Sequence, residues 1–309
     1  MHSVFIDGSA GTTGLRISER LAGRGDINII TLSESERKDP GCRRDAIRSS
    51  DVSVLCLPDD AAREAVKMAE GSGARIIDAS TAHRTAPGWV YGFPELAADR
   101  ALRIAQADRV AVPGCHASGF CAIVYPLVAC GIMPADYPAC VHSLTGYSGG
   151  GKKMIADYES DPREARAPAQ YATLSSHKHL PEMQHVCGLD AAPLFNPIVC
   201  DFYSGMLVCV PLFTSLLSRA VTPEELYGFY SDYYAGKKLI SVRQEPQNAT
   251  LYADALSGRD DMEILISGCA ERINVYARFC NLGKGASGAA VQCLNLMLGA
   301  DETAGLVTG

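Results

Sequence analysis

Short apolar runs alternate with amphipathic segments over the first third of the chain. Runs typical of buried strands fall at 3–7, 27–32, 52–57, 75–78 and 109–112, and helical spacing falls at 11–22 and 60–71. Strands that alternate with helices in this way predict parallel pairing with right-handed crossovers. We therefore expect an α/β fold with a doubly wound parallel sheet in this part of the chain.

The pattern changes after residue 138, where strand-like runs become longer and fewer helices separate them. These runs cover 139–144, 198–203, 206–211 and 273–279. They predict a second, α+β domain with a more open sheet. The closing segment, 285–309, begins with small residues, becomes apolar, and is expected to pack back onto the first domain. The predicted domains are 1–114 completed by 285–309, and 115–284.

Composition narrows the classes of function. The net charge of −7, the pI near 5.5 and the lack of long Lys/Arg runs argue against nucleic acid or a membrane surface as a partner. No apolar run approaches the ~18 residues that span a bilayer. The 12 cysteines show no CxxC pair or zinc-ligand spacing, which is typical of reduced thiols. We expect a cytoplasmic protein with small-molecule partners and no metal.

A glycine-rich turn joins the first strand to the first helix. Gly8, Gly11 and Gly14 have the spacing GxxGxxG, in the context where glycines let the backbone approach a pyrophosphate at a helix N-terminus. This predicts a Rossmann-like dinucleotide site, although a tight strand-to-helix turn would use the same glycines. The candidate cofactor contacts are Gly8, Ser9, Ala10, Gly11, Thr12, Thr13 and Gly14.

The segment after the second strand bears on the choice of nicotinamide cofactor. An NAD enzyme commonly has an acidic residue there for the ribose hydroxyls, whereas this chain has Ser33, Arg37 and Lys38. A hydroxyl and two cations favour a 2′-phosphate and therefore NADP. Glu34 would suit ribose hydroxyls instead, and a solvated loop is the remaining interpretation.

Cys115 lies between a Pro113-Gly114 turn and an apolar segment, 120–127, that is expected to be helical. Unpaired N–H groups at a helix N-terminus stabilise a thiolate and a developing oxyanion. Most cysteines in a chain are small buried hydrophobes. The turn and the helix that follows it make Cys115 the candidate nucleophile.

A thiol nucleophile needs a base, and two of the seven histidines stand just before Pro181, a residue suited to the first turn of a helix. Histidine exchanges protons near neutral pH. His179 is the first choice and His177 the second. A metal site is the weaker interpretation of His-x-His because no further ligands stand nearby, and a solvated surface histidine is the other alternative.

Two further segments are candidates for substrate anions. The glycine-rich segment 146–153 offers backbone N–H groups and lysines, and we expect Ser148, Gly149 and Lys152 to contact substrate, unless the segment is merely a mobile loop. Arg84 follows the fourth strand, on the side where doubly wound sheets bind ligands.

Together these motifs resemble the N-acetyl-gamma-glutamyl-phosphate reductase family, in its shorter second type, of the semialdehyde dehydrogenase group. The resemblance covers most of the chain, and its motifs are Gly8–Gly14, Val112–Gly119, Gly146–Lys153, His177–Glu182 and Lys284–Ala290. The chain departs from the longer type at His116-Ala117-Ser118, where that type usually has an aromatic residue, a small residue and Thr.

The resemblance implies an NADP-binding domain completed by the C-terminal helix, a catalytic and oligomerisation domain, and a homo-oligomer, either dimer or tetramer. It implies NADPH-dependent reduction of N-acetyl-L-glutamyl 5-phosphate to the 5-semialdehyde and phosphate, in arginine biosynthesis. The functional groups suit a thioester intermediate on Cys115, with His179 or His177 moving the proton.

Three alternatives stay open. The first is another acyl-phosphate reductase, acting on aspartyl or aminoadipyl phosphate, because only the substrate-end pocket separates these enzymes. The second is a non-catalytic NADP-binding protein, which would need neither Cys115 nor its histidines. The third, a thiol hydrolase or protease, leaves the glycine motif unexplained.

Overall fold

A computed structural model describes residues 1–160, 166–244 and 249–309. The chain forms two compact units. The first consists of Met1–Gly114 and Ala286–Leu306, and the second of Cys115–Gly285 and Val307–Gly309. Each unit has its own sheet.

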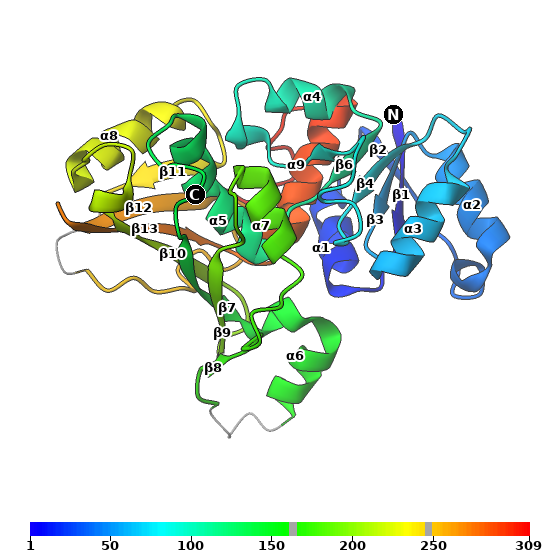
Figure 1. The fold of residues 1–309 in the computed structure, drawn as a ribbon. Coiled ribbons are helices and arrows are strands. Elements are labelled where there is room, and N and C mark those ends of the chain that lie inside the picture. Colours follow the sequence, from blue (N-terminus) through cyan, green and yellow to red (C-terminus); the bar gives the residue numbers. More distant parts are fainter. Residues whose placement is uncertain (161–165, 245–248) are drawn as a thin grey trace. The chain divides into compact units, whose positions relative to one another are not determined.

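Within the described residues, the first unit has a six-stranded sheet whose strands all run parallel, in the order β2-β1-β3-β4-β6-β5 (Figure 1). The strands are β1 (His2–Asp7), β2 (Ile27–Ile30), β3 (Val52–Leu55), β4 (Arg75–Asp78), β5 (Val90–Tyr91) and β6 (Arg109–Ala111). The winding reverses between β1 and β3, and ligands of doubly wound sheets bind at the carboxyl ends of the strands there. The segments that follow these two strands therefore form the candidate cofactor site.

Helices cover both faces of this sheet. They are α1 (Thr12–Leu21), α2 (Pro40–Ser49), α3 (Asp59–Met68), α4 (Arg100–Gln106) and α9 (Gly288–Leu298). Apolar residues of α1, α4 and α9 pack on one side of the strands, and those of α2 and α3 pack on the other. Strand residues alternate between the two clusters, as Val4 and Phe5 do, because successive side chains point to opposite faces.

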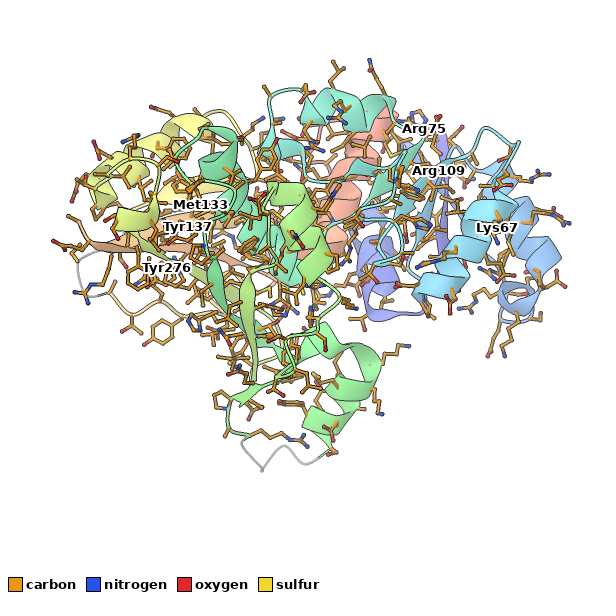
Figure 2. All side chains as sticks on the ribbon, in the orientation of Figure 1. Lys67, Arg75, Arg109, Met133, Tyr137 and Tyr276 are labelled. Atoms are coloured by element: carbon orange, nitrogen blue, oxygen red, sulfur yellow. The ribbon has the colours of Figure 1, made fainter. Side chains whose placement is uncertain are left out.

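An arginine at the amino end of β4 joins this sheet to two of its helices (Figure 2). Arg75, the first residue of β4, donates from Nη1 to the Met297 carbonyl at 2.6 Å and from Nη2 to the Ala105 carbonyl at 2.6 Å. Burial lowers the pKa of Arg75 from its ordinary value. The contact with Met297 ties the C-terminal helix α9 to a sheet formed by residues far earlier in the sequence.

The second unit has a mixed sheet of seven described strands, in the order β11-β12-β13-β10-β7-β9-β8. The strands are β7 (Cys140–Gly146), β8 (Ala169–Gln170), β9 (Leu194–Cys200), β10 (Met206–Phe213), β11 (Ile240–Arg243), β12 (Met262–Cys269) and β13 (Arg272–Phe279). Its helices are α5 (Cys115–Ala129), α6 (Gly151–Glu159), α7 (Leu180–Cys187) and α8 (Pro223–Tyr233). Helices α5 and α7 lie side by side (Figure 1).

Helix α5 is almost wholly buried against β10 and β13. A Cβ on Gly119 would lie 2.5 Å from a Val208 methyl and 2.9 Å from the Phe279 ring, so the close approach requires glycine at this position. Pro126, inside α5, cannot donate to the Ala122 carbonyl. The Tyr234 hydroxyl donates to this carbonyl instead, at 2.6 Å, so the proline is accommodated without an unsatisfied buried acceptor.

The α/β class with a doubly wound parallel sheet and a second α+β domain is confirmed. The apolar run expected to be helical at 120–127 lies in α5, and α5 begins at Cys115, which puts this residue at a helix N-terminus as predicted. The domain boundary differs from the prediction, because Gly285 and residues 307–309 lie with the second unit rather than the first. Residues 307–309 are held there because Asp260 N–H donates to the Val307 carbonyl and Val307 N–H donates to the Asp260 carboxylate.

Candidate functional site

The glycine turn of the first unit has the shape that a bound pyrophosphate needs. Gly8 has φ +85°, and a Cβ there would lie 2.3 Å from the Cys56 carbonyl oxygen. A Cβ on Gly14 would lie 2.5 Å from the Gly8 carbonyl oxygen. Gly11 caps α1, whose N-terminus has no side-chain cap and no acidic residue in its first turn. These residues therefore fit a dinucleotide, because uncapped N–H groups at a helix N-terminus bind phosphate.

A buried ion pair lies at the base of this turn and was not predicted from the sequence. Asp7 ends β1, and its carboxylate accepts from Nε and Nη2 of Arg43 on α2 at 3.1 and 2.9 Å. Both groups are largely buried. The pair joins α2 to the strand that carries the glycine turn, so it supports the geometry of the turn.

The segment predicted to select NADP forms a short turn, η1 (Glu36–Lys38), before α2. The Glu36 carboxylate accepts from the Ser33 backbone N–H at 2.7 Å, which holds the turn closed. Arg37 and Lys38 are exposed, and Lys38 Nζ lies 4.0 Å from the Glu34 carboxylate. Ser33, Arg37 and Lys38 thus lie on one exposed turn that follows β2.

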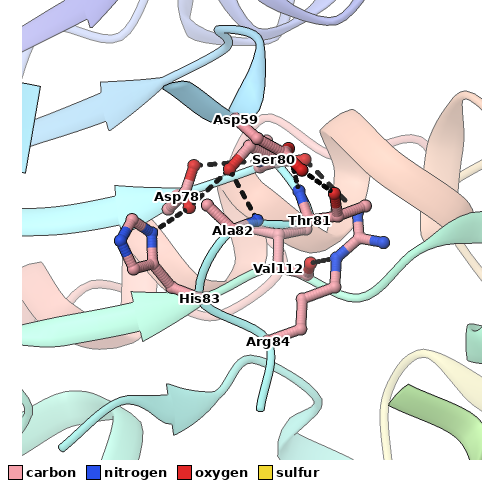
Figure 3. Close-up of polar contacts among 9 residues, drawn as sticks. Asp59, Asp78, Ser80, Thr81, Ala82, His83, Arg84 and Val112 are labelled. Atoms are coloured by element: carbon pink, nitrogen blue, oxygen red, sulfur yellow. Dashed lines mark hydrogen bonds and ion pairs between the residues drawn. The ribbon is translucent and has the colours of Figure 1, made fainter. Parts of the chain in front are cut away.

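A polar network follows β4 at the same edge of the sheet (Figure 3). The buried Asp78 carboxylate binds the Ser80 hydroxyl at 2.7 Å and the His83 ring at 2.6 Å, while the Thr81 hydroxyl donates to Asp59. Arg84 donates from Nε to the Val112 carbonyl at 2.9 Å and from Nη2 to the Ala79 carbonyl. Arg84, which the sequence predicts to contact a substrate anion, therefore binds two backbone carbonyls in the structure.

In the second unit, Cys115 is the first residue of α5 and is half-buried. The helix continues through small, buried residues, which explains why it starts earlier than the apolar pattern predicted. Burial raises the pKa of other thiols, to about 12 for Cys56 and Cys209. Those cysteines are therefore poor nucleophiles, whereas the position of Cys115 at a helix N-terminus suits a thiolate.

Gly285 lies directly against Cys115. It belongs to η5 (Gly283–Ser287), a π-helical turn that leads into α9. A Cβ on Gly285 would lie 3.0 Å from the Cys115 Cβ and 3.2 Å from the Phe279 ring. The lack of a side chain at Gly285 therefore leaves room for Cys115 in its observed position.

Three histidines form a cluster that includes His116, the residue after Cys115, although only two of them were predicted. The His116 ring centroid lies 5.8 Å from that of His177 and 5.7 Å from that of His179, and the last two lie 4.6 Å apart. The Phe195 ring lies 5.1 Å from both His116 and His177. Within the described part of the chain, no group of three or more His, Cys, Asp or Glu residues is arranged to hold a metal ion.

His116 is buried and held at both ring nitrogens. Nδ1 lies 2.6 Å from the Ser143 hydroxyl on β7, and Nε2 lies 2.7 Å from the Tyr171 hydroxyl. Burial, reinforced by the charges of His177 and Lys178, lowers the pKa of His116 to about 3. His116 is therefore a neutral imidazole at physiological pH.

His177 and His179 differ in how their rings are placed. His177 Nδ1 accepts from the His179 backbone N–H at 3.1 Å, so a neutral His177 carries its proton on Nε2. His179 is buried at the N-cap of α7, with Pro181 in the first turn as predicted. Glu182, in the same turn, is buried and was not predicted as part of the site.

The loop before His177 brings Tyr171 to the histidines. Ala172 and Ser175 have positive φ, of 52° and 53°, and the Ser175 N–H donates to the Ala172 carbonyl. Left-handed backbone at non-glycine residues is uncommon and often occurs at functional sites. Tyr171 belongs to no recognisable motif, so it could not be predicted as part of the site.

The predicted anion segment forms η3 (Tyr147–Gly150) and then the first turn of α6. The buried Ser148 hydroxyl accepts from Asn281 Nδ2 at 3.0 Å, and Asn281 Oδ1 accepts from the Gly205 N–H at 2.8 Å. Gly149 and Lys152 are exposed. The structure thus places Ser148 in a buried network and Lys152 on an exposed helix, within a segment that is helical rather than a mobile loop.

None of the described helices is long and apolar enough to cross a bilayer. All twelve cysteines lie in the described ranges, and none of them forms a disulfide.

Comparisons with known proteins agree on one group. The family model described as the semialdehyde dehydrogenase NAD-binding domain matches residues 3–104, and the semialdehyde dehydrogenase dimerisation domain matches residues 115–281. The first match indicates a nicotinamide cofactor. Among solved structures, aspartate semialdehyde dehydrogenase II of Vibrio cholerae has a TM-score of 0.74 at 15% identity, covering 96% of this chain and 98% of that one. At this identity the likeness shows the fold alone.

Curated relatives are much closer in sequence. N-acetyl-gamma-glutamyl-phosphate reductase 2 of Pseudomonas putida is 47% identical over 99% of this chain and 100% of its own length. N-acetyl-gamma-glutamyl-phosphate reductase of Brucella anthropi is 45% identical over 96% of this chain and 98% of its own length. The chain therefore belongs to the N-acetyl-gamma-glutamyl-phosphate reductase family of the semialdehyde dehydrogenases.

Proposed function

We propose that the protein reduces N-acetyl-L-glutamyl 5-phosphate to N-acetyl-L-glutamate 5-semialdehyde and phosphate with NADPH, reversibly, in arginine biosynthesis. The observation that carries this proposal is a half-buried thiol, Cys115, at the first residue of a buried helix. The ring of the next residue, His116, lies 5.8 Å from that of His177 and 5.7 Å from that of His179. This arrangement occurs in a chain 47% identical to a reductase of that name over nearly its full length.

The chemistry assigns each group a role. The Cys115 thiolate attacks the acyl-phosphate carbonyl, the C–O bond to phosphate breaks, and a thioester remains on the sulphur. When bound, the reduced nicotinamide supplies a hydride to the thioester carbonyl. The resulting thiohemiacetal oxygen takes a proton from the histidine and returns it as the carbonyl forms again. The C–S bond breaks in the same step, which releases the aldehyde and restores the Cys115 thiolate. N–H groups at the start of α5 are suited to stabilise the oxyanion.

His179 is the residue that we assign to proton transfer. A neutral His177 already uses Nδ1 to accept from the His179 N–H, so its other ring nitrogen carries a proton and cannot accept another. His116 has both nitrogens engaged. His179 is then the member of the cluster best placed to take the thiol proton and return it to the oxyanion.

We infer NADP rather than NAD from the exposed turn after β2. Ser33, Arg37 and Lys38 offer a hydroxyl and two cations, and the acidic Glu36 is bound to the Ser33 N–H. A phosphate on the ribose is favoured by this charge pattern. The proposed pyrophosphate contacts are the residues from Gly8 to Gly14, and the proposed substrate contacts are Arg84, Ser148, Gly149 and Lys152.

We also infer a homo-oligomer that pairs through one face of the second sheet. Helix α5 covers the face that carries Val208. On the opposite face Leu144, Pro211 and Tyr276 are half-exposed, and Phe213 is 55% exposed. An apolar sheet face of this kind is typical of an interface. The matched dimerisation domain supports an oligomer. The lack of disulfides among the twelve cysteines supports a cytoplasmic location.

The alternatives are not favoured. The similarity to aspartate semialdehyde dehydrogenases is 14–16% in sequence, against 45–47% for the reductases. A binding protein without catalysis would not need a thiol at a helix N-terminus beside a histidine cluster.

The test is the reverse reaction. Purified protein is mixed with N-acetylglutamate semialdehyde, phosphate and NADP, and cofactor reduction is followed at a wavelength that reduced nicotinamide absorbs. Aspartate semialdehyde and NAD serve as parallel controls. We expect a phosphate-dependent signal with the N-acetylated aldehyde and NADP. A signal confined to aspartate semialdehyde, or none with any aldehyde, would contradict the proposal.

A further inference from the structure

Three hydroxyl and imidazole groups of the second unit form a continuous hydrogen-bonded chain next to the nucleophile. Ser143 Oγ lies 2.6 Å from His116 Nδ1, and His116 Nε2 lies 2.7 Å from the Tyr171 hydroxyl. The members come from β7, the first turn of α5 and the loop after β8. His116 is the residue after Cys115, so this hydrogen-bonded chain includes a residue from the helical turn that carries the Cys115 sulphur.

The surroundings of Ser143 set the direction of this chain. Ser143 is fully buried, and His116 is the hydrogen-bond partner of its hydroxyl among the described residues. If His116 Nδ1 carried the proton, the serine hydrogen would be buried with no acceptor, which is unfavourable. The serine therefore donates to Nδ1, and because neutral imidazole has one proton, Nε2–H donates to the Tyr171 oxygen.

The phenol of Tyr171 is then an acceptor from His116, which leaves its own hydrogen to be donated elsewhere. Tyr171 lies within the histidine cluster, because its hydroxyl binds the ring of the residue after Cys115 and its ring centroid lies 5.9 Å from that of His177. Burial first, and the charge of a Cys115 thiolate second, raise the pKa of Tyr171. A phenol that accepts one hydrogen bond is also a stronger donor of its own hydrogen, because hydrogen bonds in a chain polarise one another.

We propose that Ser143 and His116 are positioning residues that fix the direction of this chain, so that the Tyr171 hydroxyl donates its hydrogen to the Cys115 reaction centre. The inference rests on the proposed function and adds to it residues that neither the thiol nor the general base accounts for. It also gives a role to His116, the position where the chain departs from the longer type of the family.

The direction of the chain is tested without any substrate. Full-length protein labelled with ¹⁵N in histidine is studied at pH 7.5 by two-bond ¹H–¹⁵N correlation, and the His116 signals are identified by their loss in His116→Gln. We expect a protonated Nε2 and an unprotonated Nδ1. A protonated Nδ1 would overturn the proposal, because Tyr171 would then donate to His116 instead of to the reaction centre.

The contribution to catalysis is tested by a double-mutant cycle in the reverse assay. We expect kcat to fall about fivefold in Ser143→Ala and about 10- to 100-fold in Tyr171→Phe, with KM for NADP unchanged and with recovery in Ser143→Thr. Because Ser143 acts through Tyr171, the double variant should be no slower than Tyr171→Phe alone. If the wild-type enzyme is active and the kcat losses of Ser143→Ala and Tyr171→Phe are additive in the double variant, this inference alone is overturned. An inactive wild-type protein would instead overturn the proposed function.

Discussion

The Tyr234 hydroxyl donates to the Ala122 carbonyl at 2.6 Å, the acceptor that Pro126 leaves without its helical donor. This bond lets α5 continue past a proline while its first turn carries Cys115. Removal of the hydroxyl in Tyr234→Phe leaves a buried carbonyl without a donor. We expect the free energy of unfolding to fall by about 1–3 kcal/mol, measured by urea denaturation.

Tyr227→Phe on the same helix, α8, is the matched control, since Tyr227 is half-exposed. Its effect should stay within about 0.5 kcal/mol. Equal losses in the two variants would show that the bond to Ala122 has no special importance for α5.

Gly285→Ala tests the packing against the nucleophile. The added methyl would lie 3.0 Å from the Cys115 Cβ, so the thiol must move. We expect kcat to fall about 10- to 100-fold in a folded protein, because small displacements of a reacting group are costly. Gly228→Ala in α8, where a Cβ meets nothing within 4 Å, should leave kcat unchanged. A Gly285→Ala enzyme with normal kcat would show that the position of Cys115 does not depend on this contact.

Asparagine substitutions separate the two predicted histidines. His179→Asn should lower kcat by about 10²–10⁴-fold, the usual contribution of general acid–base catalysis. His177→Asn should cost much less, because an asparagine oxygen can still accept the His179 N–H that His177 Nδ1 accepts now. The comparison is made from kcat profiles over pH, and a larger loss in His177→Asn would reverse the assignment.

Buried His116 makes stability depend on pH. Its pKa is about 3 in the folded protein and 6.5 ordinarily, so below pH 6.5 the unfolded chain binds a proton that the folded chain rejects. The charges facing it come from His177 and Lys178, and the His179 ring and the Tyr171 hydroxyl are its other neighbours. The free energy of unfolding therefore falls as pH is lowered, by about 2 kcal/mol from pH 7 to pH 5 through this group.

The measurement compares urea unfolding at the two pH values in wild type and His116→Gln. Between pH 7 and pH 5 the free energy of unfolding should fall by about 2 kcal/mol less in His116→Gln than in wild type. The exposed His185, changed to glutamine, provides the control and should keep the wild-type pH dependence. An unchanged dependence in His116→Gln would mean that His116 does not resist protonation in the folded state.

Much of the fold follows from local patterns. The strand expected at 75–78 matches β4 exactly in its bounds, and the glycine turn lies between β1 and α1 as predicted. The alternation of short apolar runs and helices is a local signal, so it can be recognised from a single sequence. The strands β5, β8, β11 and β12 were not predicted. A two-residue strand such as Val90–Tyr91 or Ala169–Gln170 has too little pattern of its own to be predicted.

The site was predictable where its residues form motifs. Cys115, His177 and His179 stand in recognisable local contexts. Ser143 and Tyr171 do not, because their roles arise only when β7 and a distant loop meet at the His116 ring. A serine at an inward position of an alternating strand, between Val141 and Thr145, is the faint signal that the sequence did contain.

The central claim is that Cys115 carries the acyl group, and trapping this adduct tests it most directly. Enzyme is mixed with N-acetyl-L-glutamyl phosphate in the absence of NADPH, quenched in acid, digested and analysed by mass spectrometry, with Cys115→Ser alongside. We expect an N-acetylglutamyl thioester on the peptide that contains Cys115, lost on addition of NADPH and absent from the variant. An unmodified Cys115 peptide from enzyme that turns over normally, or full activity in Cys115→Ser, would contradict the account.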